Sequence, residues 1–198
     1  MPIVDEVKKG DVKFEKVADK TLNIEASDRS IIHYQSFNIA ADETVNFSLP
    51  TINSFVLNRI FSNNSSQIFG NLTANGNVIL VNQNGFHFGP TARVEVGGLM
   101  ASTHNISDAD FLNGNYIFAG LGDTVSSSNS FILNEGEIRT RQGGMAILIA
   151  DAIENRGVIE APLGTVALAA GNLVSVDISQ DGLVSLGIQE ATAHKVLD

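Results

Sequence analysis

Residues 70–103, GNLTANGNVILVNQNGFHFGPTARVEVGGLMAST, contain two short apolar runs that repeat at a fixed spacing. Residues 72–80 (LTANGNVIL) align with residues 94–102 (VEVGGLMAS), so that Val94 follows Leu72 by 22 positions. Each unit consists of a short apolar run and a turn rich in Asn or Gly, and one unit is too short to bury its own apolar face. The spacing therefore predicts a solenoid in which successive coils stack on one another.

A second pair of repeats lies further along the chain. Residues 134–138 (NEGEI) match residues 155–159 (NRGVI) at an offset of 21, and residues 144–150 match residues 164–170 at an offset of 20, so one residue is missing from the intervening turn. The runs are rich in Val and Ile and are punctuated by Gly, which favours strands over helices. Leucine-rich repeats need Leu at fixed places, which this sequence lacks. We predict a parallel β-helix with strands near residues 78–81, 94–100, 145–149 and 165–169.

The rest of the chain is interpreted around these coils as one domain. Apolar residues alternate with polar ones from Val12 to Phe47, which predicts half-exposed strands that cap the first coil and protect its edge. Residues 107–110 (SDAD) are expected to cap a single helical turn, and residues 113–118 (NGNYIF) to form a hairpin outside the helix body. The predicted parts are the N-terminal cap and first coils (about 1–60), central coils (61–103), an extra-helical excursion (104–130) and further coils (131–198), with residues 174–178 and 183–186 in a last coil that continues into a longer protein.

Composition narrows the classes of function. The chain has 198 residues, 43% of them hydrophobic, and a net charge of −10, which repels phosphate backbones; we therefore exclude nucleic acid as a partner. Because cysteine is absent, disulfides, thiol catalysis and cysteine-bound metals are excluded. The sequence has no run of 18 apolar residues, and residues 1–10 (MPIVDEVKKG) lack the apolar core of a signal peptide.

Several segments of the sequence resemble those of a known family. Residues 75–86 (NGNVILVNQNGF), the strand patterns at residues 31–39 and 43–47, and the pair Asn58-Arg59 together resemble the N-terminal secretion domain of the filamentous haemagglutinin family. These are large exoproteins of two-partner secretion in Gram-negative bacteria. The family usually has Asn-Pro-Asn-Gly-Ile at the centre, where this chain has Gln83 in place of the proline and Phe86 in place of the isoleucine.

The resemblance implies an all-β, right-handed parallel β-helix that is presented to an outer-membrane barrel transporter through the periplasmic POTRA domains of that transporter. It also implies that the domain seeds folding outside the cell, and that the chain is a mature fragment whose signal peptide has been removed. We expect a monomeric, secreted or cell-surface domain without a small-molecule cofactor. The candidate recognition residues are Asn58, Arg59, Asn82, Gln83, Asn84 and Gly85, which are expected to lie at exposed turns. A purely structural role is open for Asn82, Asn84 and Gly85, because Asn and Gly tolerate the left-handed conformation of sharp corners.

Two other functions are less consistent with the sequence. A carbohydrate- or protein-binding adhesin module is disfavoured because exposed aromatic rows need Trp or Tyr, and the chain has no Trp and only Tyr34 and Tyr116. A β-helix enzyme that degrades polysaccharide would need paired carboxylates such as Asp108 and Asp110, but a capped turn explains these residues better. The four histidines have no spacing suited to one metal ion. We therefore predict no enzyme activity and no metal site.

Overall fold

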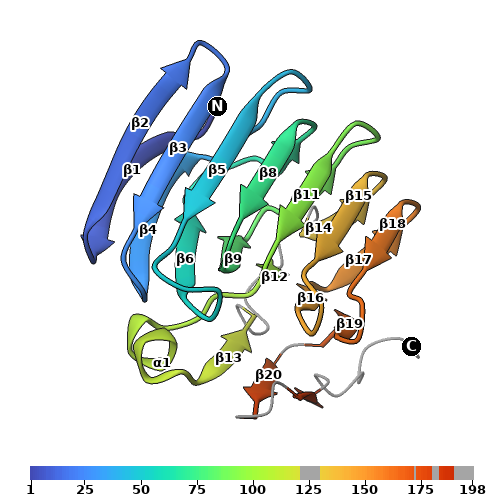
Figure 1. The fold of residues 1–198 in the computed structure, drawn as a ribbon. Helices are drawn as coiled ribbons and strands as arrows, with labels where there is room; N and C mark the ends of the chain where they lie inside the picture. The colour runs from blue at the N-terminus through green and yellow to red at the C-terminus, as the bar shows by residue number, and fades with distance from the viewer. Residues whose placement is uncertain (121–129, 172, 180–182, 190–198) are drawn as a thin grey trace.

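The computed structural model describes residues 1–120, 130–171, 173–179 and 183–189. The chain forms a parallel β-helix of about six turns. Figure 1 shows the coils stacked side by side from the N-terminal strands to the coil that holds β17, β18 and β19. The predicted fold class is therefore confirmed, and its architecture is built from three long sheets and one small one.

The strands form four sheets, each with the following spatial order. Sheet A contains β1 (Ile3–Lys9), β4 (Ser30–Ser36), β6 (Phe55–Ile60), β9 (Asn77–Asn82), β12 (Gly98–Ser102), β16 (Met145–Ile149) and β19 (Thr165–Ala169). Sheet B contains β18 (Val158–Glu160), β15 (Glu137–Thr140), β11 (Arg93–Val96), β8 (Asn71–Ala74), β5 (Thr44–Ser48), β3 (Thr21–Ala26) and β2 (Val12–Ala18). Sheet C contains β17 (Ala152–Asn155), β14 (Phe131–Asn134), β10 (Phe86–Phe88) and β7 (Ser66–Ile68). Sheet D contains β13 (Tyr116–Ala119), β20 (Leu173–Ile178) and β21 (Val184–Gln189), and the helix is α1 (Asp108–Asn113).

The lumen of the β-helix is filled by rows of apolar side chains. Alternate residues of a strand face the same side, so parallel pairing places equivalent residues of successive coils above one another. One such row in sheet B runs through Leu22, Val45, Leu72, Val94 and Ile138. These side chains belong to one core cluster, in which each fully buried residue contributes roughly 1.5 to 3 kcal/mol before the entropy of ordering is subtracted.

Sheet A is apolar on both faces, and this explains the parts that lie outside the β-helix. Its outward row of Ile31, Leu57, Ile79, Met100 and Ile147 is buried in a second cluster. That cluster is completed by side chains from α1, β13 and β20. Figure 1 shows these three elements below the stack of coils, as an added layer. An apolar sheet face needs such a cover.

The register confirms most of the predicted repeat and corrects one part of it. The offsets of 21 and 20 hold between β14 and β17 and between β16 and β19. Val94 pairs with Leu72 at 22, as expected, but Leu99 pairs with Val78 at 21. The single strand expected near residues 94–100 is wrong, because the chain turns at Gly97 between β11 and β12. A Cβ at Gly97 would lie 2.6 Å from the Gly76 carbonyl oxygen, so the corner needs glycine.

The N-terminal strands form the expected cap. β1 pairs antiparallel with β4, and β2 pairs antiparallel with β3, whereas β3 and β4 each pair in parallel with the next coil. The antiparallel strands cover the edges that the first coil would otherwise expose. The N-terminal amine of Met1 lies 2.5 Å from the Glu43 carboxylate, which ties the start of the cap to the next corner.

The excursion is present, but the hairpin expected at residues 113–118 is wrong, because α1 ends at Asn113 and β13 pairs with a distant strand. Antiparallel hydrogen bonds between Asn105 and Ala119 close its base. Its strand β13 pairs antiparallel with β20, which in turn forms an antiparallel hairpin with β21. The expected last coil at residues 174–186 is therefore wrong, because these strands join sheet D. Residues 121–129 of the predicted excursion and residues 190–198 lie outside the described residues.

No helix among the described residues is long and apolar enough to cross a membrane.

Candidate functional site

The corner at residues 82–85 is held by the side chain of Asn82. Its Nδ2 donates to the Asn64 carbonyl oxygen at 3.1 Å and to Ser66 Oγ at 3.0 Å, both on the preceding coil. Its Oδ1 accepts the backbone N–H of Asn84 at 3.0 Å, and its carbonyl accepts the N–H of Gly85 at 2.9 Å. Asn82 is fully buried. The side chain thus organises the turn and joins two coils.

The other three residues of this corner differ in exposure. Asn84 is half-buried, and its Nδ2 donates to the Ser62 carbonyl oxygen at 2.7 Å. Gly85 has a φ of +94°, and a Cβ there would lie 2.2 Å from the Phe131 carbonyl oxygen, so glycine is required twice over. Gln83 is half-buried and has no hydrogen bond to another described residue. Of the four, Gln83 is the residue the fold needs least.

Asn58 lies in the lumen instead of at the exposed turn expected from the sequence. It sits within β6, pairs with Ile32 and Leu80, and is fully buried. Its Nδ2 donates to the Ile79 carbonyl oxygen at 3.2 Å, while its Oδ1 has no partner among the described residues. The hydroxyl of Tyr34, also buried in the lumen, has no partner there either, and burial raises the pKa of that hydroxyl.

Arg59 faces the outside of sheet A and anchors the excursion. Its Nη2 donates to the Ile106 carbonyl oxygen at 2.7 Å, its Nε to Asn105 Oδ1 at 3.1 Å, and its Nη1 lies 2.8 Å from Asp108 Oδ1. Arg59 is only 8% exposed. It too lies in mid-strand and not at a turn. Because its partners are 46 to 49 residues away, local sequence gave no sign of this contact.

His33 extends the same network to the cap. Arg59 Nη1 lies 3.1 Å from His33 Nε2, and His33 Nδ1 lies 3.0 Å from the Glu6 carboxylate. Arginine can only donate, so Nε2 must accept and Nδ1 must carry the proton that is donated to Glu6. This assignment makes His33 a neutral link between β1, β4 and β6.

Arg29 is a second anchor of the excursion. Its Nη1 donates to the Phe111 carbonyl oxygen at 2.5 Å, near the C-terminal end of α1, where a positive charge is favoured. The guanidinium also lies within about 6 Å of the ring centroids of Phe55, Phe111 and Tyr116. Arg29 has a φ of +56°, which is uncommon for a residue other than glycine. Sequence reasoning missed this residue because its partners lie 82 and 87 positions away.

Asp108 and Asp110, the two carboxylates that a polysaccharide-degrading enzyme would use as a pair, have structural partners. Ser107 is the N-cap of α1, with its Oγ accepting the N–H of Asp110 at 3.0 Å and its hydroxyl donating to Asp110 Oδ2 at 2.5 Å. Asp108 is paired with Arg59. The capped helical turn predicted from the sequence is thus confirmed.

Each histidine in the described part of the chain pairs with a carboxylate. His87 Nε2 lies 2.9 Å from Glu135, and His104 Nε2 lies 3.2 Å from Asp151. The hydrogen bond from His87 is the main reason why the pKa of Glu135 lies below its usual value. In the described part of the chain, no cluster of three or more His, Cys, Asp or Glu side chains is arranged to hold a metal ion. His194 lies outside that part.

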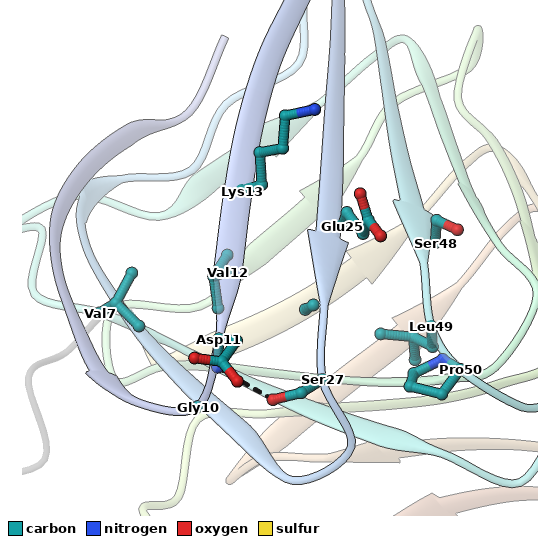
Figure 2. Close-up of a pocket in the computed structure, with 11 residues that line it drawn as sticks. Val7, Gly10, Asp11, Val12, Lys13, Glu25, Ser27, Ser48, Leu49 and Pro50 are labelled. Atoms are coloured by element: carbon teal, nitrogen blue, oxygen red, sulfur yellow. Dashed lines mark hydrogen bonds between the residues drawn. The ribbon is translucent and has the colours of Figure 1, made fainter.

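A hollow lies at the cap end of the β-helix. Its volume is about 920 Å³, and Figure 2 shows that its lining residues come from the cap strands and the corner after β5. The N–H of Asp11 donates to Ser27 Oγ at 3.0 Å across one side of it. Asp11, Lys13 and Glu25 contribute charges of both signs to its lining.

Comparisons with known proteins agree with this geometry. The family model described as "TPS secretion domain" matches residues 7–197. A heme/hemopexin-binding protein of Haemophilus influenzae is 29% identical over 192 residues, which are 95% of this chain and 21% of that protein. A second Haemophilus influenzae protein of that description is 35% identical over 128 residues, which are 64% of this chain and 13% of that protein. The chain thus spans only a small part of the length of these relatives.

A solved structure gives the same result. The crystal structure of the HMW1 secretion domain from Haemophilus influenzae superposes with a TM-score of 0.85 at 32% sequence identity. The similarity covers 94% of this chain and 49% of that chain.

Proposed function

The chain belongs to the family of TPS secretion domains of two-partner secretion exoproteins, and on that premise we propose that it is recognised in extended form by the POTRA domains of a cognate outer-membrane barrel transporter. Exoproteins of this family are secreted or found on the cell surface. The domain acts as a monomer, and its partner is a protein, not a nucleic acid or a cofactor. It has no catalytic role, a proposal supported by the structural engagement of Asp108 and Asp110.

The burial of the candidate recognition residues carries this proposal. Asn58 and Asn82 are fully buried, and Arg59 is nearly so. A transporter therefore reaches these side chains only before the coils close. An extended segment can add as a strand to a sheet edge of a periplasmic domain, which would satisfy its backbone groups. Recognition and folding then compete for the same residues.

Folding outside the cell would bias the movement outward. Each coil that forms adds several buried apolar side chains to the lumen, such as Leu72 and Val78. Each such side chain is worth roughly 1.5 to 3 kcal/mol, from which the entropy of ordering the coil is subtracted. Once the first coils have stacked beyond the membrane, the next coil finds a template. No nucleotide-driven motor is needed for this bias.

The test compares two matched pairs of substitutions. Asn82→Ala with Asn84→Ala alters the proposed recognition corner between β9 and β10. Asn75→Ala with Asn77→Ala alters a similar corner, the preceding one in the same coil, between β8 and β9. Asn75 binds both backbone groups of Leu49, and Asn77 is buried with bonds to the preceding coil. Each pair is expected to cost about 2 to 4 kcal/mol of stability. We expect secretion to fall more for the first pair at equal loss of melting temperature.

Gln83→Ala adds a variant that leaves the fold intact. The melting temperature of the purified protein should be unchanged, because Gln83 has no hydrogen-bond partner among the described residues. Secretion by cells that carry the transporter should fall. If secretion follows the melting temperature in both double variants and Gln83→Ala is secreted normally, this corner has no recognition role.

A further inference from the structure

We propose that a groove at the corner between sheets A and C binds a neutral saccharide. The groove has a volume of about 500 Å³ and is lined mainly by amide side chains, with one aromatic ring. These residues are Asn38, Asn63, Asn64, Gln67, Asn84 and Phe131. The groove shares Asn84 with the proposed recognition corner, but it forms only when the coils are folded, whereas the transporter is proposed to bind an extended chain.

One edge of the groove is set by a close approach of two backbones at a stacked row of sheet C. Ser66, Phe86 and Ile132 pair in register along sheet C, so the residues before them, Ser65, Gly85 and Phe131, follow one another along the β-helix. Ser65 and Phe131 both line the groove, and the glycine between them in the row lets the Phe131 backbone approach, because a Cβ at Gly85 would lie 2.2 Å from the Phe131 carbonyl oxygen. The φ of +94° at Gly85 also favours glycine, so the start of β14 and the Phe131 ring are placed beside the amides by this residue.

Charge selects the class of ligand. None of the described residues that line the groove is charged, although the chain carries 12 basic and 22 acidic residues. An anionic ligand finds no cation in the groove and is repelled by the net charge of −10. A cation finds no carboxylate. The groove therefore suits an uncharged ligand with many hydrogen-bonding groups.

The amides of Asn38, Gln67 and Asn84 are held in place by bonds that leave one side of each without a partner among the described residues. Asn38 Oδ1 accepts the N–H of Gln67 at 2.8 Å, which leaves its Nδ2. Gln67 Nε2 donates to Ser65 Oγ at 2.8 Å, which leaves its Oε1. Asn84 Nδ2 donates to the Ser62 carbonyl oxygen, which leaves its Oδ1. Donors and acceptors fixed in this way match hydroxyl groups, which both donate and accept.

Asn63 and Phe131 complete the site. The Asn63 side chain has no hydrogen bond to another described residue and is exposed. Phe131 is 40% exposed, and its backbone is fixed at the start of β14. The negative face of an aromatic ring attracts the weakly positive C–H groups of a sugar ring. Phenylalanine thus supplies the platform that the scarcity of Trp and Tyr made improbable from composition.

The proposal is tested by saturation-transfer NMR and calorimetry on the purified protein with chitotriose, cellotriose and mannotriose. A sulfated heparin disaccharide and a short Asn/Ser peptide serve as comparison ligands. At least one neutral trisaccharide should bind, and Phe131→Ala and Asn63→Ala should each weaken that binding about tenfold. Both variants should keep the wild-type melting temperature, because neither side chain is buried.

Phe61→Ala is the matched control, since Phe61 is 60% exposed and does not line the groove. Its binding should equal that of the unaltered protein. The proposal is overturned if none of the three trisaccharides binds, if the sulfated disaccharide or the peptide binds better, or if Phe61→Ala weakens binding as much as Phe131→Ala does. Because no transporter takes part, failure here leaves the secretion role standing.

Discussion

Replacing Arg59 by methionine is expected to lower the free energy of unfolding by about 2 to 4 kcal/mol and to release the excursion from sheet A. Methionine keeps an apolar stem but leaves the Ile106 carbonyl, the Asn105 amide and His33 without their donor. The ion pair with Asp108 contributes less, because that carboxylate is 39% exposed and is screened by solvent. The measurement is urea unfolding together with hydrogen exchange at residues 105–119.

Arg139→Met is the control for this variant. Arg139 pairs with Glu137 and Glu160, but its side chain is 51% exposed, and such surface pairs are worth less than about 1 kcal/mol. Faster exchange at residues 105–119 should therefore appear in Arg59→Met alone. Equal loss of stability in the two variants, with unchanged exchange in the excursion, would show that Arg59 is not its anchor.

Phe88→Ala is expected to cost about 3 to 5 kcal/mol, because it leaves a cavity in the lumen. Phe88 is fully buried in β10 and stacks on Phe86 with ring centroids 6.0 Å apart. If coil stacking biases the chain outward, the same variant should also be secreted more slowly and should accumulate in the periplasm. Calorimetry of the purified domain and fractionation of cells give the two readings.

The same substitution at an exposed phenylalanine separates burial from composition. Phe61→Ala removes a largely exposed ring that meets the His33 ring edge-on, and it should cost less than about 1 kcal/mol. Its secretion should be normal. Normal secretion of Phe88→Ala, despite the expected loss of stability, would contradict a role for folding in outward movement.

Local patterns were sufficient for the coils and insufficient for the corners. Residues 145–149 and 165–169 were placed correctly because a Val- and Ile-rich run bounded by Gly forms the same strand in any coil. The shift at Gly97 was missed because the similarity at offset 22 continues across the corner, where one residue fewer connects the strands. Sequence similarity does not record where a backbone turns.

The candidate site divides in the same way. The corner at residues 82–85 was recognised because Asn and Gly at that spacing have a local reason to turn. The positions of Asn58 and Arg59 within a strand were not predicted, because two consecutive polar residues are usually exposed and were therefore expected at a turn. In the fold one side chain faces the lumen and the other meets the excursion, since successive residues of a strand point to opposite sides.

The sequence by itself determined the repeat, the strands with a period near 21 residues, the cap and the helical turn at residues 108–113, because each depends on neighbours in the chain. The tertiary structure alone decided which partner the later strands take. Val174, Val176 and Ile178 alternate as they would in a coil, yet Val174 and Val176 pair with β13, and all three help to cover the outer face of sheet A. Alternation of apolar and polar residues indicates that a strand has one apolar face. Only the packed molecule shows against which surface that face is buried.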